Sequence, residues 1–282
     1  VTPFCGDGVD LEAFDRLIER QIQGGTDAIV VCGTTGEAAT LSYNERMALI
    51  ERCVRTADRR VPVIAGSGTN STASSIALSK AAQSAGVDAL LTVTPYYNKA
   101  SQSGLVQHFS AIADAVDVPV ILYNVPARTG IGCTVQTYQA LAKHPNIVGV
   151  KEASDNFDLI QDTLNLCPPG FTVWSGNDGS TAAIMALGGK GVISVAANVV
   201  PREMHELTQL CLKNRFLEAG ALQLKLHELI RALFCEVNPI PVKAAMELLG
   251  LCSGELRLPL CRMSERHLEQ LSSALKPFRA SV

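Results

Sequence analysis

The chain has 282 residues, of which 47% are hydrophobic and 18% are charged, and its formal net charge is −3 at pH 7. This balance supplies enough apolar side chains for a large buried core and excludes disorder as the main state. A chain without excess positive charge lacks a surface that neutralises phosphates, so we expect no nucleic-acid partner. No apolar run reaches the ~20 residues that a bilayer span requires, so we expect no membrane insertion.

Nine cysteines are spread along the chain without a CxxC pair or a repeating spacing. An odd number without such a framework predicts free thiols in a reducing compartment. No basic-then-apolar leader is visible, so we expect a cytoplasmic protein, or a plastid protein if a transit peptide has been removed.

Short β-branched runs alternate with helical periodicity from the first residues onward. The expected helices include Leu11–Gln23, Ser42–Asp58 and Thr72–Ala85. The expected strands are Val1–Pro3 as the end of a truncated strand, Ala28–Cys32, Val61–Gly66, Ala89–Pro95, Val118–Pro126, Ile147–Glu152, Thr172–Asn177 and Gly191–Ala197. Apolar strands that alternate with helices indicate a parallel sheet covered on both faces, and eight such units predict a closed (β/α)8 barrel, also called a TIM barrel. An open doubly wound sheet is the alternative, but the GxGxxG turn after its first strand is absent.

Beyond Pro201 the pattern is helical only, with helices expected over 203–213, 216–234, 241–249 and 264–275. We therefore predict a barrel domain over residues 1–214 and a small C-terminal helical domain over residues 215–282.

The active site of such a barrel lies at the carboxyl ends of its strands. Polar side chains interrupt the sequence there, in the stretches Gly33–Glu37, Thr94–Asn98, Tyr123–Gly130, Lys151–Glu152 and Ser175–Asp178. One rim of the barrel should therefore collect threonines, tyrosines, an arginine and a lysine.

Lys151 ends a strand that is otherwise apolar, so its side chain is expected in a crowded barrel mouth. Burial favours the neutral amine, and a neutral amine can attack a ketone to form a Schiff base. The structural alternative is an ion pair of Lys151 with Glu152 or Asp155 at the rim.

Three further positions support a carbonyl chemistry, although each also has a structural interpretation. Tyr123 ends the neighbouring strand and could carry protons, or it could simply pack with its hydroxyl in water. Thr34 and Thr35 could hold a carboxylate through their N–H and hydroxyl groups, or they could cap a helix. Arg128 could bind a carboxylate through a bidentate pair of guanidinium hydrogen bonds, or it could be a solvated loop residue.

Metal catalysis has little support, because no two of the five histidines have ligand spacing and no Walker-type loop is present. We expect no metal site.

Together these stretches resemble the 4-hydroxy-tetrahydrodipicolinate synthase (dihydrodipicolinate synthase) family, within the class I aldolase-like group that includes N-acetylneuraminate lyase. The most specific parts are those at Gly33–Glu37, Thr94–Asn98, Tyr123–Gly130 and Lys151–Ala153, and the further segments Gly191–Val200 and Asn238–Lys243.

The resemblance implies a lyase of lysine and diaminopimelate biosynthesis that condenses pyruvate with L-aspartate 4-semialdehyde. It implies that Lys151 forms an imine with pyruvate, so that no separate cofactor is needed, and that Thr34 and Thr35 hold the pyruvate carboxylate. Tyr123, Thr35 and Tyr97 would form a proton relay, with Tyr97 supplied by a neighbouring subunit. The protein would then be a homo-oligomer, at least a dimer and usually a tetramer.

The resemblance also assigns binding roles. Arg128 would bind the carboxylate of the semialdehyde, and Gly176 and Ile193 would offer backbone groups near the pyruvate pocket. Arg128 favours the synthases over the sugar-acid lyases, whose acceptors present hydroxyl groups at that place. The family more often has glycine where this chain has Ala127, which questions the geometry of the loop.

Regulation by lysine is expected to be weak or absent. Lysine-inhibited relatives use histidine and glutamate side chains where this chain has Arg46 and Ser74, and an arginine would repel the ammonium group of lysine. Asn70 and Tyr96 do match, so a vestigial lysine site is possible.

Two other functions remain open. The same imine could serve a retro-aldol lyase or dehydratase of a sugar-derived 2-oxo acid, of the N-acetylneuraminate or 2-keto-3-deoxygluconate type. The pocket could also belong to a non-catalytic sensor of an oxo acid, although a sensor has no need of a proton relay.

Overall fold

The computed structural model describes residues 1–281. The chain forms two compact units, which we treat in turn. Residues 62–193 form the central unit, and residues 1–61 together with the residues from 194 onward form the terminal unit.

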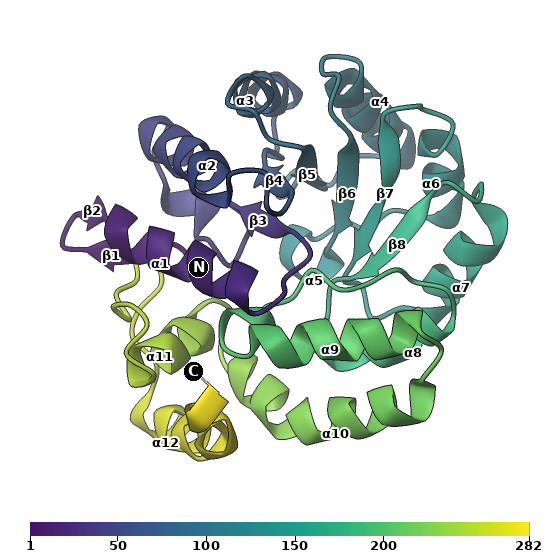
Figure 1. Ribbon diagram of the computed structural model, residues 1–282. Coiled ribbons are helices and arrows are strands. Elements are labelled where there is room, and N and C mark those ends of the chain that lie inside the picture. Colours follow the sequence, from purple (N-terminus) through teal and green to yellow (C-terminus); the bar gives the residue numbers. More distant parts are fainter. Residues whose placement is uncertain (282) are drawn as a thin grey trace. The chain divides into compact units, whose positions relative to one another are not determined.

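The central unit is built on five strands that are hydrogen-bonded in chain order, each parallel to the next (Figure 1). They are β4 (Val63–Gly66), β5 (Ala89–Val93), β6 (Val120–Asn124), β7 (Ile147–Glu152) and β8 (Thr172–Ser175). Every residue of β6 is buried. This burial is what a continuous apolar run in a parallel sheet requires, because both faces of such a sheet are covered.

Helices connect these strands, as parallel neighbours require. They are α3 (Thr72–Ser84), α4 (Gln102–Ala113), α5 (Pro126–Thr129), α6 (Val135–Leu141), α7 (Phe157–Leu166) and α8 (Thr181–Ala186), with a 3-10 turn η2 (Asp178–Ser180) before α8. Four of them begin where a short polar side chain accepts a free N–H of the first turn, namely at Ser71, Ser101, Thr134 and Asn156. These caps fix where each helix starts, and so the length of the loop after each strand.

The terminal unit joins the two ends of the chain. Its first part contains the hairpin β1 (Phe4–Cys5) and β2 (Gly8–Val9), α1 (Leu11–Gln23), β3 (Ile29–Val31), η1 (Ala38–Thr40) and α2 (Tyr43–Ala57). Its second part contains η3 (Ala196–Asn198), α9 (Pro201–Leu212), α10 (Phe216–Leu233), α11 (Ile240–Leu248), α12 (Glu265–Leu275) and η4 (Lys276–Ser281).

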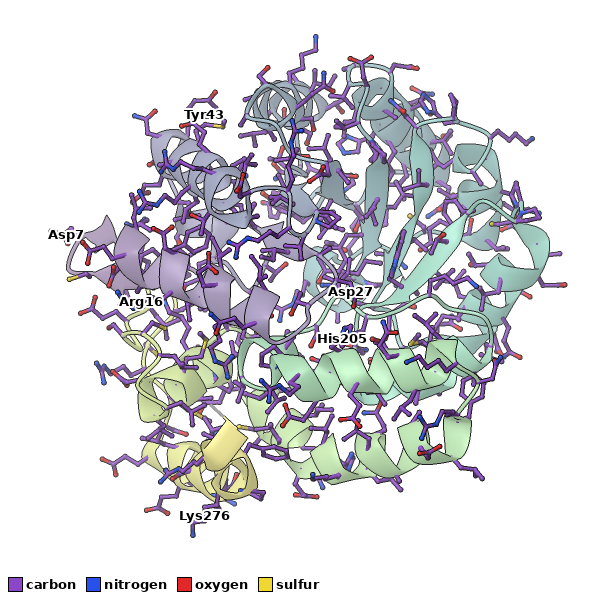
Figure 2. The ribbon with its side chains drawn as sticks, in the orientation of Figure 1. Asp7, Arg16, Asp27, Tyr43, His205 and Lys276 are labelled. Atoms are coloured by element: carbon purple, nitrogen blue, oxygen red, sulfur yellow. The ribbon has the colours of Figure 1, made fainter. Side chains whose placement is uncertain are left out.

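Contacts within the terminal unit tie the two parts together. Helix α1 packs on α2 within the first part, and α10 packs on α9 and α12 within the second part. Side-chain hydrogen bonds then join the two parts. The guanidinium of Arg20 donates to the carbonyl oxygens of Asn198 and Val199, at 3.1 and 2.7 Å. His205 of α9 faces Asp27 in the loop after α1, with Nδ1 and Oδ2 3.1 Å apart (Figure 2). The start of α9 is therefore held against α1.

Six of the eight expected strands form, and the helices expected beyond Pro201 are all present. The prediction of a strand over Gly191–Ala197 is wrong: Val192 makes one isolated parallel bridge with Ser175, and the chain then turns into η3. The N–H of Ala197 donates to the Ser194 hydroxyl, so a backbone donor is used locally instead of in a ladder.

The prediction of a first strand ending at Val1–Pro3 is also wrong for the described residues. The Thr2 hydroxyl donates to the carbonyl of Gly36, and the Pro3 carbonyl accepts from the N–H of Asp10 at the base of the β1–β2 hairpin. Proline also lacks the N–H that a ladder would need. The boundary expected between residues 214 and 215 falls between α9 and α10 and stays a prediction.

All nine cysteines are free thiols. Across the described residues, no helix combines the length and the apolar character needed to cross a bilayer.

Candidate active site

Lys151 and Tyr123 are brought together by strand pairing in the central unit. They are direct partners in the parallel register of β7 and β6, and residues at matching positions of neighbouring strands point to the same face of a sheet. The Nζ atom of Lys151 lies 4.4 Å from the centre of the Tyr123 ring. Tyr123 is buried and Lys151 is half-buried. The structure thus places the Lys151 amine against the face of the Tyr123 ring.

The structural alternative for Lys151, an ion pair at the rim, is wrong. Glu152 points to the opposite face of the strand, as the next residue must. The Asp155 carboxylate is taken by the side-chain amide of Asn177. Within the part of the chain that the structure describes, no carboxylate pairs with the Lys151 amine.

Glu152 is instead the centre of a buried network that sequence reasoning missed. Its carboxylate accepts from Asn124 Nδ2 at 3.0 and 3.1 Å, from the Tyr138 hydroxyl at 2.6 Å and from the Ser154 N–H at 2.9 Å. Asn124 Oδ1 in turn accepts from the N–H of Cys133. Burial raises the pKa of Glu152, and these donors oppose that rise. The network fixes the ends of β6 and β7, and therefore the residues Tyr123 and Lys151 that precede Asn124 and Glu152.

Gly176 and Ile193 lie beside these strand ends. The N–H of Gly176 donates to the carbonyl of Glu152 at 2.7 Å, and the N–H of Ile193 donates to the carbonyl of Ser175 at 2.9 Å. A Cβ atom on residue 176 would lie 2.4 Å from the Cβ of Ala153, so only glycine fits this close approach.

Thr34 and Thr35 belong to the terminal unit, in the loop after β3. The loop closes on itself, since the N–H of Gly36 donates to the Gly33 carbonyl and the N–H of Glu37 to the Thr34 carbonyl. Among the described residues, the N–H groups of Thr34 and Thr35 have no hydrogen-bond acceptor, so they are free for a ligand. The helix-capping alternative is wrong, because Ser42 caps α2 in a capping box with Glu45.

Two residues from far along the chain support this loop, and sequence reasoning assigned them no role. Asn238 Nδ2 donates to the Thr35 hydroxyl at 2.9 Å, while its buried Oδ1 has no partner in the described structure. Lys243 is fully buried and donates to Glu37 Oε1 at 2.8 Å and to the Thr2 carbonyl at 3.0 Å. Glu37 needs this support, because its φ of 53° is in the left-handed region. For both Asn238 and Lys243, the signal in the sequence that could have indicated a role was a polar side chain among apolar neighbours.

Tyr97 and Arg128 lie on exposed segments of the central unit. Tyr97 is 85% exposed in the loop after β5, and its φ of 78° is unusual for a bulky residue. Arg128 is exposed on the short helix α5, and its guanidinium has no acceptor among the described residues. Ala127 lies in the same helix, where the right-handed backbone suits alanine, so the substitution does not strain the loop.

The positions considered for lysine binding lie in both units. In the central unit, Asn70 is exposed before α3, Tyr96 is 39% exposed before α4, and Ser74 lies in the first turn of α3. In the terminal unit, Arg46 donates to the carbonyl of Ala38 at 2.5 Å.

The described residues contain no cluster of three histidine, cysteine or acidic side chains that could hold a metal ion.

Three comparisons with known proteins identify the family. The model of the dihydrodipicolinate synthetase family matches residues 1–278. A 4-hydroxy-tetrahydrodipicolinate synthase of Acetivibrio thermocellus is 49% identical over 278 residues, which are 99% of this chain and 94% of that protein.

Similar solved structures indicate the same family. A dihydrodipicolinate synthase from Aquifex aeolicus matches with a TM-score of 0.97 and 46% identity, covering 99% of this chain and 95% of that one. One from Acinetobacter baumannii, complexed with pyruvate, matches with a TM-score of 0.97 and 44% identity, covering 100% and 97%. These matches confirm the predicted fold class, a TIM barrel followed by C-terminal helices. The chain belongs to the dihydrodipicolinate synthetase family.

Proposed function

We propose that this chain condenses pyruvate with L-aspartate 4-semialdehyde to give 4-hydroxy-tetrahydrodipicolinate, through an imine on Lys151. The observation that carries the proposal is the Lys151 amine, which lies beside the Tyr123 ring without a carboxylate partner among the described residues. A lysine amine that is not held in an ion pair is available to attack a ketone and form an imine. Its family membership and the pyruvate-bound relative support the same substrate.

The chemistry runs through four steps. The Lys151 amine adds to the keto carbon of pyruvate, and loss of water gives the imine. Loss of a proton from the pyruvate methyl group gives an enamine. The enamine carbon attacks the aldehyde carbon of the semialdehyde, whose oxygen takes a proton. The semialdehyde amine then attacks the imine carbon and expels Lys151, which closes the ring and regenerates the enzyme. The net release is one water molecule, and no external cofactor enters.

The remaining residues bind or move protons in this scheme. The free N–H groups of Thr34 and Thr35 suit the pyruvate carboxylate, and the exposed guanidinium of Arg128 suits the carboxylate of the semialdehyde. The Gly176 and Ile193 backbone groups would border pyruvate. Tyr123 would pass protons to and from the reacting oxygen and nitrogen atoms, in a relay with Thr35 and Tyr97.

Assembly and compartment follow from the same reasoning. Because Tyr97 is 85% exposed, we propose that it completes the relay of a neighbouring subunit, which makes a dimer the minimum active form and a dimer of dimers the full assembly. Nine free thiols suit a reducing compartment, and we propose the cytoplasm.

The proposal is tested by incubating the protein with pyruvate, reducing it with borohydride, and measuring its intact mass and a peptide map. One pyruvyl adduct on Lys151 is expected. Lys151→Ala should abolish the adduct, whereas Lys190→Ala, at an exposed lysine of the same unit, should leave it intact. Turnover with the semialdehyde, compared with cleavage of N-acetylneuraminate or 2-keto-3-deoxygluconate, then identifies the acceptor. An unmodified protein, or an adduct that survives Lys151→Ala, would refute the imine.

We also propose that lysine inhibits this enzyme weakly or not at all. Arg46 carries a positive charge where inhibited relatives offer neutral or negative side chains, and Ser74 supplies no charge to balance it. A titration of turnover with L-lysine checks this, and half-inhibition below about 1 mM would contradict it.

A further inference from the structure

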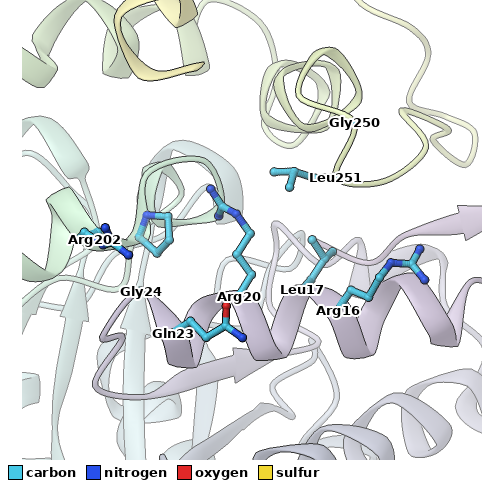
Figure 3. Close-up of a pocket in the computed structure, with 9 residues that line it drawn as sticks. Arg16, Leu17, Arg20, Gln23, Gly24, Arg202, Gly250 and Leu251 are labelled. Atoms are coloured by element: carbon cyan, nitrogen blue, oxygen red, sulfur yellow. The ribbon is translucent and has the colours of Figure 1, made fainter. Parts of the chain in front are cut away.

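The terminal unit contains a cavity of about 400 Å³ that has no part in the proposed chemistry (Figure 3). Its walls come from one face of α1, from the first turn of α9 and from the turn after α11. The lining residues are Arg16, Leu17, Arg20, Gln23, Gly24, Pro201, Arg202, Gly250 and Leu251. The volume is in the range of small-molecule sites in proteins.

Three of these residues are arginines, and the acidic side chains of α1 form no ion pair with them in the described structure. Of the three carboxylates of α1, Asp15 accepts from Arg52 and Glu19 accepts from Arg60, while Glu12 forms no ion pair in the part of the chain that the structure describes. Within the described residues, the guanidinium groups lining the cavity form no ion pair. Their terminal nitrogens are therefore not occupied by a carboxylate.

Arg20 is the fixed member of the three. Its two terminal nitrogens donate to the carbonyl oxygens of Asn198 and Val199, which holds the guanidinium in place before any ligand arrives. Burial lowers the pKa of Arg20, and the nearby Glu203 carboxylate opposes this effect. The described lining contains three arginines and no acidic residue, so the cavity keeps an excess of positive charge beside this single nearby carboxylate.

Arg16 and Arg202 are exposed and can turn toward a ligand. Arg16 lies one helical turn before Arg20 on α1, and Arg202 lies in the first turn of α9, whose N-terminal end has no side-chain cap. The field of a helix N-terminus adds to the attraction for an anion. Between the charged groups, Leu17 and Leu251 form an apolar wall (Figure 3). The cavity therefore offers separate cationic groups around a short apolar surface.

We propose that this cavity binds a small organic anion that carries two anionic groups, phosphoryl or carboxylate, joined by a short carbon segment. Arginine pairs with either group through two parallel hydrogen bonds, and the apolar wall accommodates the carbon segment. A single inorganic ion would use only part of the site and bind more weakly.

The test is calorimetric titration of the full-length protein at constant ionic strength, with 3-phosphoglycerate, citrate and inorganic phosphate as probes. One 3-phosphoglycerate site per chain is expected, with inorganic phosphate at least ~10-fold weaker. Citrate separates the two kinds of anionic group: equal affinity for citrate assigns carboxylates, and weaker binding assigns a phosphoryl group. Binding in the presence of saturating pyruvate keeps the proposed active site out of the measurement.

Variants locate the site. Arg16→Gln with Arg202→Gln should weaken 3-phosphoglycerate at least ~10-fold, because two charge-assisted contacts are lost. Arg55→Gln with Arg266→Gln removes the same charge from exposed positions outside the cavity and should change the affinity less than ~2-fold. Arg16→Lys with Arg202→Lys keeps the charge and loses the paired hydrogen bonds, so an intermediate affinity is expected. No binding of either organic probe, or equal weakening in both glutamine pairs, would overturn the proposal.

Discussion

The Nζ atom of Lys151 lies 4.4 Å from the centre of the Tyr123 ring, and the two residues are direct partners in the register of β7 and β6. Their arrangement is set by backbone pairing between two strands and not by a loop. Rigid elements hold reacting groups more accurately than loops do. The Glu152 network fixes the same strand ends from the opposite face. We therefore expect Lys151 and Tyr123 to act together in forming the imine.

Tyr123→Phe should separate the ring from the hydroxyl. The ring that packs against the Lys151 amine remains, so the fold and the borohydride-trapped adduct should survive. Loss of the proton carrier should slow adduct formation and turnover by roughly 10²–10³-fold, as for removal of a general acid–base group. The rate is measured by quenching with borohydride at successive times after pyruvate is added.

Tyr138→Phe is the matched control, because it removes the hydroxyl of another buried tyrosine in the same unit. That hydroxyl donates to Glu152, so its loss should lower the free energy of unfolding by about 1–3 kcal/mol. Asn124 and Ser154 still donate to Glu152, so adduct formation should slow far less than in Tyr123→Phe. Equal rate losses in the two variants would contradict a proton-carrying role for Tyr123.

Tyr97 offers a test of the proposed exchange between subunits. Tyr97→Phe and Lys151→Ala should each be nearly inactive, because one lacks the relay and the other lacks the amine. In a mixed dimer, the site with an intact Lys151 would receive an intact Tyr97 from the partner. Unfolding and refolding the two variants together should therefore restore about a quarter of the wild-type activity, since half of the dimers are mixed and each has one working site. Activity no greater than the sum of the separate variants would place Tyr97 in its own subunit's site.

The strands of the central unit were predictable because each is a continuous apolar run, and burial on both faces demands such a run. The run at Gly191–Ala197 has the same composition, yet only Val192 pairs, because a strand needs a neighbour with free donors and acceptors along its length. An apolar composition indicates that a segment is buried, but it does not indicate whether the segment pairs with a neighbouring strand. The same limit explains why the strand expected to end at Val1–Pro3 was wrong.

Some residues of the candidate site were likewise predictable from the sequence, and others were not. Lys151 and Tyr123 were predictable, because a polar residue at the end of an apolar strand has few structural reasons to be there. Asn238 was not assigned a role, because its partner Thr35 is 203 positions away and no local pattern joins them. Side-chain hydrogen bonds between distant segments depend on tertiary packing, which a single sequence does not show.

Asn238 is expected to act as a positioning residue through the Thr35 hydroxyl. Its amide donates to the hydroxyl oxygen, so the hydroxyl hydrogen must be donated elsewhere, which gives the proposed relay a direction. Asn238→Ala should lower kcat by roughly 10-fold with little change in the KM for pyruvate, because the carboxylate-binding N–H groups remain. The pH dependence of kcat should also change, which a purely structural role would not cause.

A double-mutant cycle with Thr35→Val supplies the control for Asn238. If both residues act through one hydrogen bond, the double variant should be little slower than Thr35→Val alone. Multiplicative losses in kcat would show that Asn238 acts independently of Thr35 and would remove its positioning role.

Stability at low pH should depend on the ion pair between Glu45 of α2 and Arg257. Hydrogen bonds from the Arg257 guanidinium lower the pKa of Glu45 from 4.5 to about 2. A carboxyl whose pKa is lower in the folded state stabilises the protein above the unfolded pKa, and this contribution is lost as the pH falls from about 4.5 to about 2. Glu45→Gln should therefore lower the free energy of unfolding by roughly 1–2 kcal/mol at neutral pH and by almost nothing near pH 2. Glutamine still fits the capping box with Ser42, so the difference reports the charge.

Glu218→Gln is the control, because it breaks a more exposed ion pair with Arg215 and should have a smaller effect on the free energy of unfolding at every pH. Urea unfolding of both variants across this pH range measures the slopes, and parallel curves for Glu45→Gln and the wild type would exclude the ion pair as the source of the acid sensitivity.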